Sequence, residues 1–519
     1  MKNTKRMLKQ AAAGLLAAAM LMTGCSKALS GQGGDPQTKE GDKKTESSAD
    51  SKEGQAQIDT SKEVELIMYL VGSEPARYGE VLEIFNEKLK ADINATLTVK
   101  WLSWGDYLTK YPLVLSSGEP IDLIYSANWI DFYQHAANGA FMPLNDLLPI
   151  YCPKSFSGYP KEEAFPQTSI DGQVYAYGST YPTYSAYGAY VRGDLLEKYG
   201  MEPVKTLDDY GDYLKTVAKE DPDLVPMQIV ATKGSQLDDV YLSMDGMYPL
   251  SGNNGSFYFV DPKDPQGKVY CKTDWEKMPE FLEKMKEWSD AGCWSKSALS
   301  NQDKSLFAAG KAASRLGNYD QYVGDYINAP ERNIQFVNFT KNIERLSFTQ
   351  DAMSVPISAK NPERALMMLD LILTDSSYYD LLAYGIEGET YRFDENNFVE
   401  ALDPKNFPLE SGTSGFRTPE NNHYKAGSPA AIIEDVNRMK EESVPDKYRA
   451  FVMDTSNVKN EYAAVQNVIS QYYNPLKLGY TNDYKTDFEN LKEQLRLAGN
   501  DKVIEEFQRQ IDEFNKSNP

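Results

Sequence analysis

Aromatic rings beside amide or carboxylate groups follow three predicted strands of this chain. Glu74 comes shortly after the first strand, Trp104 follows the second, and Asn128 with Trp129 follows the third. In a parallel sheet the carboxyl ends of the strands meet at one edge, where ligands bind. A ring offers an apolar platform, and polar groups at its rim bind hydroxyls. The pattern favours a site for a half-polar ligand, although aromatic rings at strand ends often only cover the core.

Motifs for catalysis are scarce. Only two histidines occur, His135 and His423, so a zinc site or a Ser-His-Asp triad is a poor expectation. The sequence contains no nucleophile elbow, Walker loop, zinc-protease motif or EF-hand spacing. The 76 Asp and Glu residues leave a glycoside hydrolase pair open, because such a pair is defined in space. We expect no enzyme, no cofactor and no metal site.

The composition is that of an acidic globular chain. Its 519 residues predict about two to four domain-sized units. The 54 Lys and Arg residues against 76 Asp and Glu give a net charge of −22, and no basic stripe is present, which argues against nucleic-acid binding. Tyrosine is the outlier with 35 residues, which suits either a half-polar binding surface or an aromatic-rich core.

The N-terminus has the features of a bacterial export signal. Four basic residues within 2–9 precede an apolar run from Ala11 to Met22, which is too short to span a bilayer. The following Thr-Gly-Cys resembles the end of a lipobox, with Met22 where leucine is usual. We predict a signal peptide over 1–24, a lipid on Cys25, and anchoring at the extracytoplasmic face of the cell membrane. A plain secreted protein is the alternative.

A predicted tether follows the lipidated cysteine. Residues 26–60 contain no aromatic residue and consist mainly of Gly, Ser, Lys, Gln, Thr and acidic residues. Such a segment cannot bury enough apolar surface to offset the entropy lost on ordering. We therefore predict that 25–60 is a disordered tether carrying the globular part.

Three cysteines remain after Cys25, namely Cys152, Cys271 and Cys293. An odd number in an exported chain leaves at least one thiol unpaired. Cys271 could pair with Cys293, but free buried cysteines are the simpler interpretation. Because no CxxC motif is present, the cysteines predict neither a redox site nor a zinc knuckle.

Strands and helices alternate through the globular part. Residues 64–71, 97–101 and 121–125 have the composition of short strands, and apolar residues from Val81 to Leu89 repeat with helical spacing. This alternation favours right-handed βαβ crossovers and a mostly parallel sheet. Farther along, Asn-Pro-Glu at 361–363 is typical of a helix start, and the C-terminus has strong helical periodicity.

Four segments occur in the order typical of one protein family. The first, 111–144, contains Ser-Gly-Glu-Pro-Ile-Asp-Leu-Ile-Tyr, and the second, 171–196, contains Tyr-Val-Arg-Gly-Asp-Leu-Leu. The third, 307–319, has a small-residue turn before Gly-Asn-Tyr, and the fourth consists of 351–360 and the predicted helix that follows. Together they resemble the extracellular solute-binding proteins of family 1, the sugar-type receptors of ABC importers. The resemblance covers nearly all of the chain after the tether.

The resemblance implies a two-lobed α/β fold of the periplasmic-binding-protein type, class II-like, with mostly parallel sheets flanked by helices. Both lobes would be discontinuous: lobe 1 at 61–178 plus 352–415, and lobe 2 at 179–351 plus 416–519 with a C-terminal helical extension. Hinge strands are expected near 177–187 and 349–354. Residues 384–391 and the segment after them resemble a subgroup with an added C-terminal domain of uncharacterised role.

The resemblance also implies a function and further site residues. Such a protein, expected to be a monomer, captures an extracellular sugar or oligosaccharide between its lobes and delivers it to an ABC transporter permease. In the family an aromatic platform follows the small-residue turn, which points to Tyr319, preceded by Asn318. Tyr181 and Tyr184 would contribute from the hinge. Tyr319 could instead be a core-facing ring that closes the strand end.

Three other functions fit parts of the sequence. A peptide-binding receptor of the same fold would need backbone-pairing edges and ion pairs in place of stacked rings. A lipid-anchored glycoside hydrolase would need two carboxylates about 5–10 Å apart across its cleft, and it would turn over oligosaccharides. A structural or adhesive lipoprotein would show no closure on binding a ligand.

We predict that Cys25→Ser abolishes membrane anchoring without affecting the globular part. The variant lacks the sulfur that carries the lipid, and residues 26–60 have almost no apolar side chains to pack against a core. Cell fractionation should move the protein out of the membrane fraction, with an unchanged melting temperature. A variant that still sediments with membranes would contradict the predicted lipidation.

Overall fold

The computed structural model describes residues 59–517, except 185–186, 230–235, 251–256, 262–263, 265, 302, 304, 340–342, 410–412, 429, 445–447, 449–450 and 452. The predicted signal peptide, Cys25 and nearly all of the predicted tether lie outside the described residues. Among the described helices, none is both long enough and apolar enough to cross a membrane.

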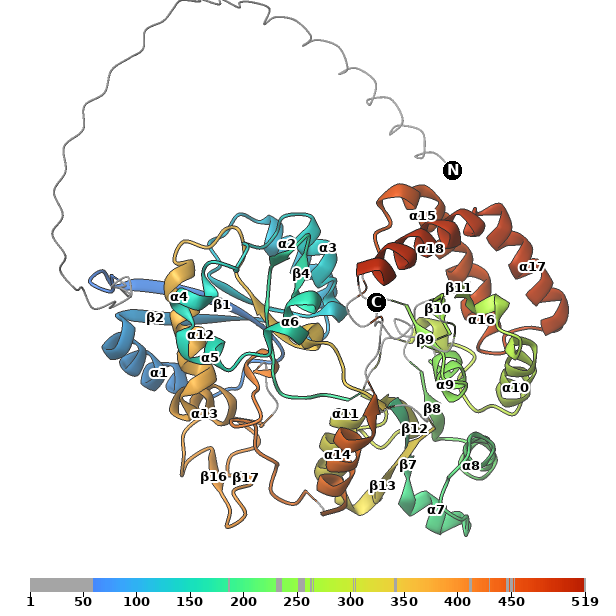
Figure 1. Cartoon of the computed structure of the whole chain (residues 1–519). Coiled ribbons are helices and arrows are strands. Elements are labelled where there is room, and N and C mark those ends of the chain that lie inside the picture. The colour runs from blue at the N-terminus through green and yellow to red at the C-terminus, as the bar shows by residue number, and fades with distance from the viewer. Residues whose placement is uncertain are drawn as a thin grey trace, which may run out of the picture. The chain divides into compact units, whose positions relative to one another are not determined.

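Lobe 1 is defined here by one hydrophobic core that runs from Leu66 to Tyr177 and from Phe348 to Phe416. Its centre is a five-stranded sheet of order β2-β1-β3-β15-β6 (Figure 1). The strands are β1 (Val64–Val71), β2 (Ala95–Leu102), β3 (Leu123–Ser126), β6 (Tyr177–Gly178) and β15 (Ala352–Ser354). β1 pairs in parallel with both β2 and β3, whereas β15 is antiparallel to β3 and β6.

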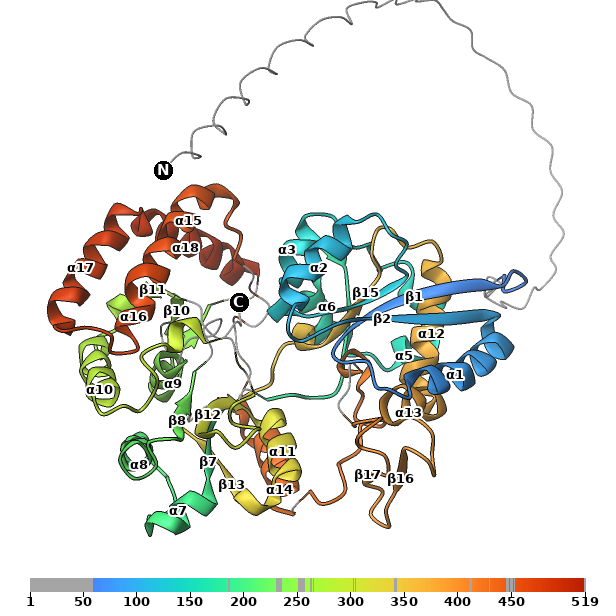
Figure 2. The same ribbon diagram turned by 180° about the vertical axis from the view of Figure 1, so that it is seen from behind.

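Helices lie on both faces of this sheet (Figures 1 and 2). They are α1 (Tyr78–Ile93), α2 (Tyr107–Ser116), α3 (Phe132–Ala137), α4 (Leu148–Tyr151), α5 (Pro153–Ser157), α6 (Lys161–Thr168), α12 (Pro362–Thr374) and α13 (Ser376–Tyr384). α1 buries Val81, Phe85 and Leu89 of the predicted helical repeat, whereas Ile84, its fourth member, is 38% exposed. Asn94 caps the end of the helix in a left-handed conformation with φ of 49°. α12 begins at Pro362, as the Asn-Pro-Glu sequence predicts.

Lobe 2 contains two hydrophobic cores. Both draw on the same two stretches of the chain, which run from Tyr184 to Ile343 and from Ile432 to Ile511. Its main sheet has the order β13-β7-β12-β8. The strands are β7 (Tyr187–Arg192), β8 (Val225–Gln228), β12 (Ala312–Asn318) and β13 (Ile334–Asn338). Only the β8–β12 pairing in this sheet is parallel, because β7 runs antiparallel to both of its neighbours. This differs from the mostly parallel sheets expected.

The antiparallel strands are those that arrive from the other lobe. β7 starts beside the ends of β12 and β13, with Tyr187 opposite Asn318. In the same way β15 starts beside the end of β3, with Ala352 opposite Ser126. A strand that enters at the edge where parallel strands end has to run back against them. The crossings therefore attach to the carboxyl-terminal edge of each sheet.

The remaining elements complete the two lobes. In lobe 2 and its C-terminal part these are α7 (Gly193–Tyr199), α8 (Leu207–Glu220), α9 (Leu237–Met244), α10 (Met278–Asp290), α11 (Tyr319–Asn328), α14 (Ala430–Glu442), α15 (Lys459–Val468), α16 (Asn474–Leu476), α17 (Tyr484–Leu497), α18 (Asn500–Ser517), β9 (Tyr248–Pro249), β10 (Tyr258–Val260) and β11 (Val269–Cys271). Short pairs are β4 (Ser169–Ile170) with β5 (Gln173–Val174), β14 (Ile343–Glu344) with β18 (Ser443–Val444), and β16 (Tyr391–Phe393) with β17 (Val399–Ala401).

Phe348 and Phe416, which the predicted boundaries assign to lobe 2, pack in the lobe 1 core.

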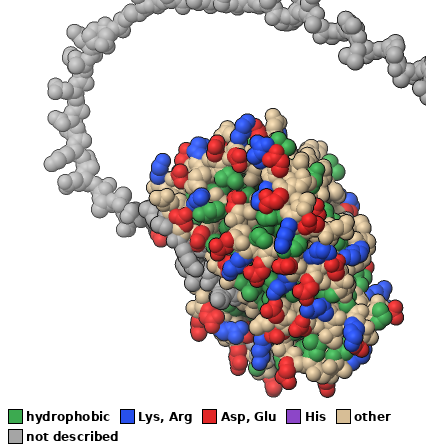
Figure 3. Space-filling view, turned by 90° about the vertical axis from the view of Figure 1, so that its right-hand side faces the viewer, with side chains coloured by type: hydrophobic (Ala, Val, Ile, Leu, Met, Phe, Trp, Pro, Cys, Tyr) green, Lys and Arg blue, Asp and Glu red, His purple; other side chains and the backbone are tan. Residues whose placement is uncertain are grey.

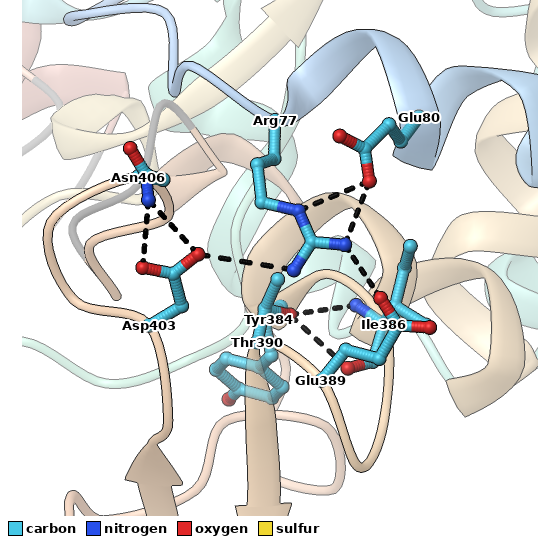
Figure 4. A network of polar contacts seen from close by, with 8 residues as sticks. All are labelled: Arg77, Glu80, Tyr384, Ile386, Glu389, Thr390, Asp403 and Asn406. Atoms are coloured by element: carbon cyan, nitrogen blue, oxygen red, sulfur yellow. Dashed lines mark hydrogen bonds and ion pairs between the residues drawn. The ribbon is translucent and has the colours of Figure 1, made fainter.

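A polar network fastens the region around β16 and β17 to the start of α1 (Figure 4). The Arg77 guanidinium forms ion pairs with Glu80 at 2.7 Å and Glu389 at 2.5 Å, and reaches Asp403 at 3.8 Å. Thr390 donates a hydrogen bond to the Tyr384 carbonyl at 2.7 Å. These contacts hold the loop after α13 against lobe 1.

The C-terminal helices α15 to α18 belong to the larger core of lobe 2. At its centre Lys272 donates to Asp238 at 2.7 Å and to Asp239 at 2.6 Å. Lys477 and the Tyr473 hydroxyl, both from the C-terminal part, also donate to Asp238, at 3.3 and 2.9 Å. Burial opposes its charge, but the two ammonium groups hold the pKa of Asp238 below its usual value. Buried charges thus join the C-terminal helices to α9.

We predict that Lys272→Met strongly destabilises the protein. The substitution removes the shared partner of two carboxylates that are at most 9% exposed, and breaking such a buried pair costs about 3–5 kcal/mol. Lys277→Met is the matched control, because Lys277 pairs with Asp245 at an exposed position; its loss costs under about 1 kcal/mol. Urea unfolding should separate the two variants, and equal midpoints would contradict the prediction.

Candidate ligand-binding site

The ends of β1, β2 and β3 form one edge of lobe 1. Val71 lies opposite Leu102, and Tyr69 lies opposite both Lys100 and Ile124, so the three parallel strands end at a similar level. The loops that follow them carry Glu74, Trp104, and Asn128 with Trp129. The structure therefore brings the loops of the sequence-predicted residues to the same edge of the sheet.

Four aromatic side chains at this edge contact one another, and we call them the aromatic cluster: Trp104, Tyr107, Tyr125 and Trp129. The Trp104 and Trp129 rings stack with centroids 5.9 Å apart, and Tyr107 meets both rings edge-on. Trp129 donates its indole N–H to the Gln350 carbonyl at 2.8 Å, which fixes the ring. Trp104 is 49% exposed. The cluster therefore combines a fixed ring with one open to solvent.

A buried ion pair supports the aromatic cluster from behind. Asp351 pairs with Arg417 at 2.8 Å, and their side chains are 11% and 15% exposed. The Tyr125 hydroxyl donates to the other Asp351 oxygen at 2.5 Å. Burial, followed by the Asp351 charge, raises the pKa of Tyr125 well above its usual value. Arg417 also lies over the Tyr181 ring, 5.0 Å from its centroid, so Tyr181 adjoins the same support.

Polar groups beside the aromatic cluster differ in their availability. Asn128 is 7% exposed, and within the described part of the chain its side-chain amide forms no hydrogen bond. Glu74 is exposed in the loop after β1. Asp131, two residues after Trp129, is also exposed and adopts a left-handed conformation with φ of 61°. Asp131 caps the end of the 3-10 turn Asn128–Ile130, so it lies on the same loop as Trp129. These groups can bind hydroxyls at the rim of a ring.

Tyr319 lies inside lobe 2 and is 4% exposed. Its hydroxyl donates to Asp435 at 3.1 Å, and its ring packs edge-on against Phe336 at 5.1 Å. Asn318 caps the start of α11 by accepting the Gln321 N–H at 2.9 Å. This arrangement fits the alternative role of a core ring that closes a strand end, because α14 covers the ring. Trp129 and Trp104 then become the leading platforms.

The hinge tyrosines occupy different surroundings. Tyr181 accompanies Arg417 and is partly exposed, whereas Tyr184 is 8% exposed and forms an isolated bridge with Arg345. The structure therefore groups Tyr181, but not Tyr184, Asn318 or Tyr319, with the support of the aromatic cluster. Asp131 was not among the site residues predicted from the sequence, but its position two residues after Trp129 could have indicated it. The Asp351–Arg417 pair had no local signal.

A separate cavity of about 510 Å³ lies in lobe 2 beside the edge strand β8. Its polar wall comes from residues 295–303, where Ser295 and Ser297 bond each other at 2.8 Å. Asp303 is likewise engaged, by the Ser305 hydroxyl at 2.6 Å. Because these groups satisfy one another and no aromatic ring is among the described residues that line the cavity, the aromatic cluster is the better candidate site.

The cysteines have no role in this site. Cys152, Cys271 and Cys293 are free and buried, as the simpler interpretation of the sequence predicts. Burial raises the pKa of Cys271 and of Cys293 to about 12, so both stay protonated and unreactive. Among the described residues, no group of three or more His, Cys, Asp or Glu side chains could hold a metal ion.

The surface charge is mixed on the face drawn in Figure 3. Lysine and arginine side chains lie interspersed with aspartate and glutamate, without an extended basic area on that face. A surface of this kind does not attract a phosphate backbone. This pattern agrees with the acidic composition of the sequence.

Comparison with known proteins extends the structural picture. Residues 80–386, more than half of the chain, match the model of a family described as bacterial extracellular solute-binding protein. Residues 447–516 match a domain of unknown function, DUF3502. A carbohydrate ABC transporter substrate-binding protein of Streptococcus pneumoniae serotype 4 is 26% identical over 467 residues, which are 87% of this chain and 91% of that protein.

Solved structures share the two-lobed fold. The N-glycan transport solute binding protein NgtS from Streptococcus pneumoniae aligns with a TM-score of 0.72 and 24% identity, over 88% of this chain and 99% of that one. The S. pneumoniae substrate binding protein FusA in complex with kestose aligns with a TM-score of 0.60 and 16% identity, over 88% and 100% of the two chains.

We predict that Tyr319→Ala mainly destabilises lobe 2. Truncating a buried aromatic side chain costs about 3–5 kcal/mol of folding free energy, and the variant also leaves Asp435 without the tyrosine hydroxyl. Thermal unfolding should show a much lower melting temperature, whereas the surviving folded protein should keep its ligand affinity. Weakened binding with an unchanged melting temperature would return Tyr319 to the site.

Proposed function

Because the chain belongs to the bacterial extracellular solute-binding protein family, we propose that it captures a carbohydrate at the aromatic cluster and delivers it to an ABC transporter permease. It is a binding protein and not an enzyme. The observation that carries the proposed ligand class is the Trp104–Trp129 pair, half open to solvent at the sheet edge where the loops of Asn128, Asp131 and Glu74 also lie.

The chemistry of this cluster suits a sugar. A pyranose or furanose ring presents C–H groups that pack on an indole face and hydroxyls that bind amides and carboxylates at its rim. The two indoles stack with centroids 5.9 Å apart, and Trp104, which is 49% exposed, presents the open part of the pair. Relatives support this class, since NgtS has been solved with Man5GlcNAc and FusA with kestose.

The location proposed for the protein follows from its N-terminus. The family is extracellular, and we propose that the lipid on Cys25 and the tether over 25–60 hold a monomeric receptor at the outer face of the cell membrane. This arrangement keeps the binding site near a permease while the tether leaves the receptor free to turn.

A thermal-shift screen tests the proposed ligand class. A ligand that binds only the native state stabilises it by mass action, by about 2.7 kcal/mol when the ligand concentration is a hundred times Kd. This stabilisation raises the melting temperature. The screen uses Man5GlcNAc, kestose, their constituent monosaccharides and short peptides. Stabilisation by an oligosaccharide supports the proposal, and stabilisation by peptides alone would replace it with a peptide receptor.

We predict that Trp104→Ala weakens binding of the oligosaccharide found in that screen without unfolding the protein. Removing a stacking platform costs about 1–3 kcal/mol of binding, roughly 5–150-fold. Leu113→Ala on α2 is the control, because Leu113 is 67% exposed and outside the aromatic cluster. Isothermal titration of both variants should show a loss for Trp104→Ala alone. Equal affinities of the two variants would show that the ligand does not bind at this edge of the lobe 1 sheet.

A further inference from the structure

Tyr125 joins the aromatic cluster to the return crossing between the lobes. It lies on β3, is 3% exposed, and packs its ring against Trp129 with centroids 5.9 Å apart. Its hydroxyl donates to the Asp351 carboxylate at 2.5 Å. Trp129 reaches the preceding residue of the same crossing, because its indole N–H donates to the Gln350 carbonyl at 2.8 Å. Two rings of the cluster therefore hold two adjacent residues of the crossing.

Asp351 extends this connection to the other two crossings. Its second carboxylate oxygen accepts from the Arg417 guanidinium at 2.8 Å, and its backbone carbonyl accepts the Ser179 N–H at 2.8 Å. The Ser179 hydroxyl in turn donates to the Arg417 carbonyl at 2.8 Å. Ser179 lies on the first crossing, Asp351 on the return crossing and Arg417 on the third. Each crossing thus contributes one residue to a closed set of polar contacts.

The backbones of the crossings also pack directly on one another at this point. A Cβ atom added to Gly178, on the first crossing, would lie 2.6 Å from the Phe348 carbonyl oxygen. One added to Gly415, on the third crossing, would lie 3.0 Å from the Ala352 carbonyl oxygen. Glycine permits this approach because it has no side chain. A shift of the return crossing therefore has to move the other two crossings as well.

We propose that Tyr125 is a positioning residue that couples ligand binding at the aromatic cluster to closure of the lobes. The inference rests on the proposed function for the identity of the ligand. A ligand shifts the equilibrium between open and closed states only if its interactions differ between them. The hydrogen bonds from Tyr125 and Trp129 to residues 350–351 make the position of the rings depend on the bend of the crossings. A carbohydrate packed on Trp104 and Trp129 therefore favours one bend over the other.

Distances between the lobes can be measured by pulsed electron paramagnetic resonance. The full-length protein carries nitroxide labels on cysteines introduced by Glu83→Cys in α1 and Glu283→Cys in α10, two exposed positions. Cys25→Ser removes the cysteine of the predicted lipidation site, and the three other native cysteines are buried. The labels then report the distribution of interlobe distances.

The ligand-free distribution tests whether Tyr125 positions the crossings. Tyr125→Phe keeps the ring of the cluster and removes only the hydroxyl, so the distribution should become wider than in the wild type. Tyr378→Phe is the matched control, because its hydroxyl also donates to a carboxylate of lobe 1, Asp92 at 2.7 Å. This control should keep the wild-type width. Equal widths for the two variants would overturn the proposal.

The response to ligand is the measurement that a merely structural role would not change. With saturating Man5GlcNAc or kestose, Tyr125→Phe should keep an open-to-closed ratio at least roughly fivefold above that of the wild type, the lower end of typical coupling between sites. Tyr378→Phe should close as the wild type does. Trp104→Ala should need more ligand yet close to the same extent, because it removes a ligand contact and leaves the hydrogen bonds to the crossing in place.

Two outcomes separate this inference from the proposed function. Wild-type closure of Tyr125→Phe at saturation would overturn the coupling while leaving the proposed function intact. If the wild-type protein closes with neither probe, the proposed function fails for these carbohydrates, and the ligand-free distances alone decide whether Tyr125 positions the crossings.

Discussion

The ion pair between Asp351 and Arg417 joins the three segments that connect the lobes. Asp351 ends the return crossing before β15, and Arg417 lies on the third crossing, before α14. The Arg417 carbonyl accepts the Ser179 hydroxyl at 2.8 Å and the Tyr181 N–H at 3.2 Å, which brings in the first crossing. Both charged side chains are largely buried, so removing one leaves the other without compensation. The aromatic cluster depends on the same support, because Tyr125 donates to Asp351.

Those parts of the fold that depend on local periodicity could be predicted from the sequence. The strand at 64–71, the helix repeat from Val81 to Leu89 and the helix start at Pro362 all follow from side-chain spacing and capping chemistry. The common edge of Trp104 and Trp129 follows in turn, because parallel strands place their following loops together. The antiparallel direction of β7 could not be predicted in this way, since it depends on where the chain enters lobe 2.

The site residues show the same division between local and long-range information. Trp129 carries a signal within its own loop, whereas Arg417 acquires its role only through Asp351, 66 positions away. Tyr319 follows the small-residue turn of the resembled family, but α14 approaches from more than a hundred residues later and covers it through Asp435. A pattern around one residue cannot show which distant helix will bury it. For this reason the exposed rings, rather than the best family match, form the candidate platform.

The Asp351–Arg417 pair limits where the crossings between the lobes can bend. On the lobe 1 side of this pair the crossings are fixed by buried charges and by hydrogen bonds to Ser179 and Tyr181. On the lobe 2 side the contact between Arg345 and Glu163, at 3.5 Å, involves a glutamate that is 66% exposed, and such pairs contribute about 0–1 kcal/mol. The Arg345 guanidinium also lies over the Phe348 ring of the lobe 1 core, 4.7 Å from its centroid. Breaking the exposed ion pair itself costs little, and a ligand with contacts on both lobes favours the closed state. The aromatic cluster lies on the lobe 1 side of the Asp351–Arg417 pair, and the C-terminal domain is joined to lobe 2 through Asp238.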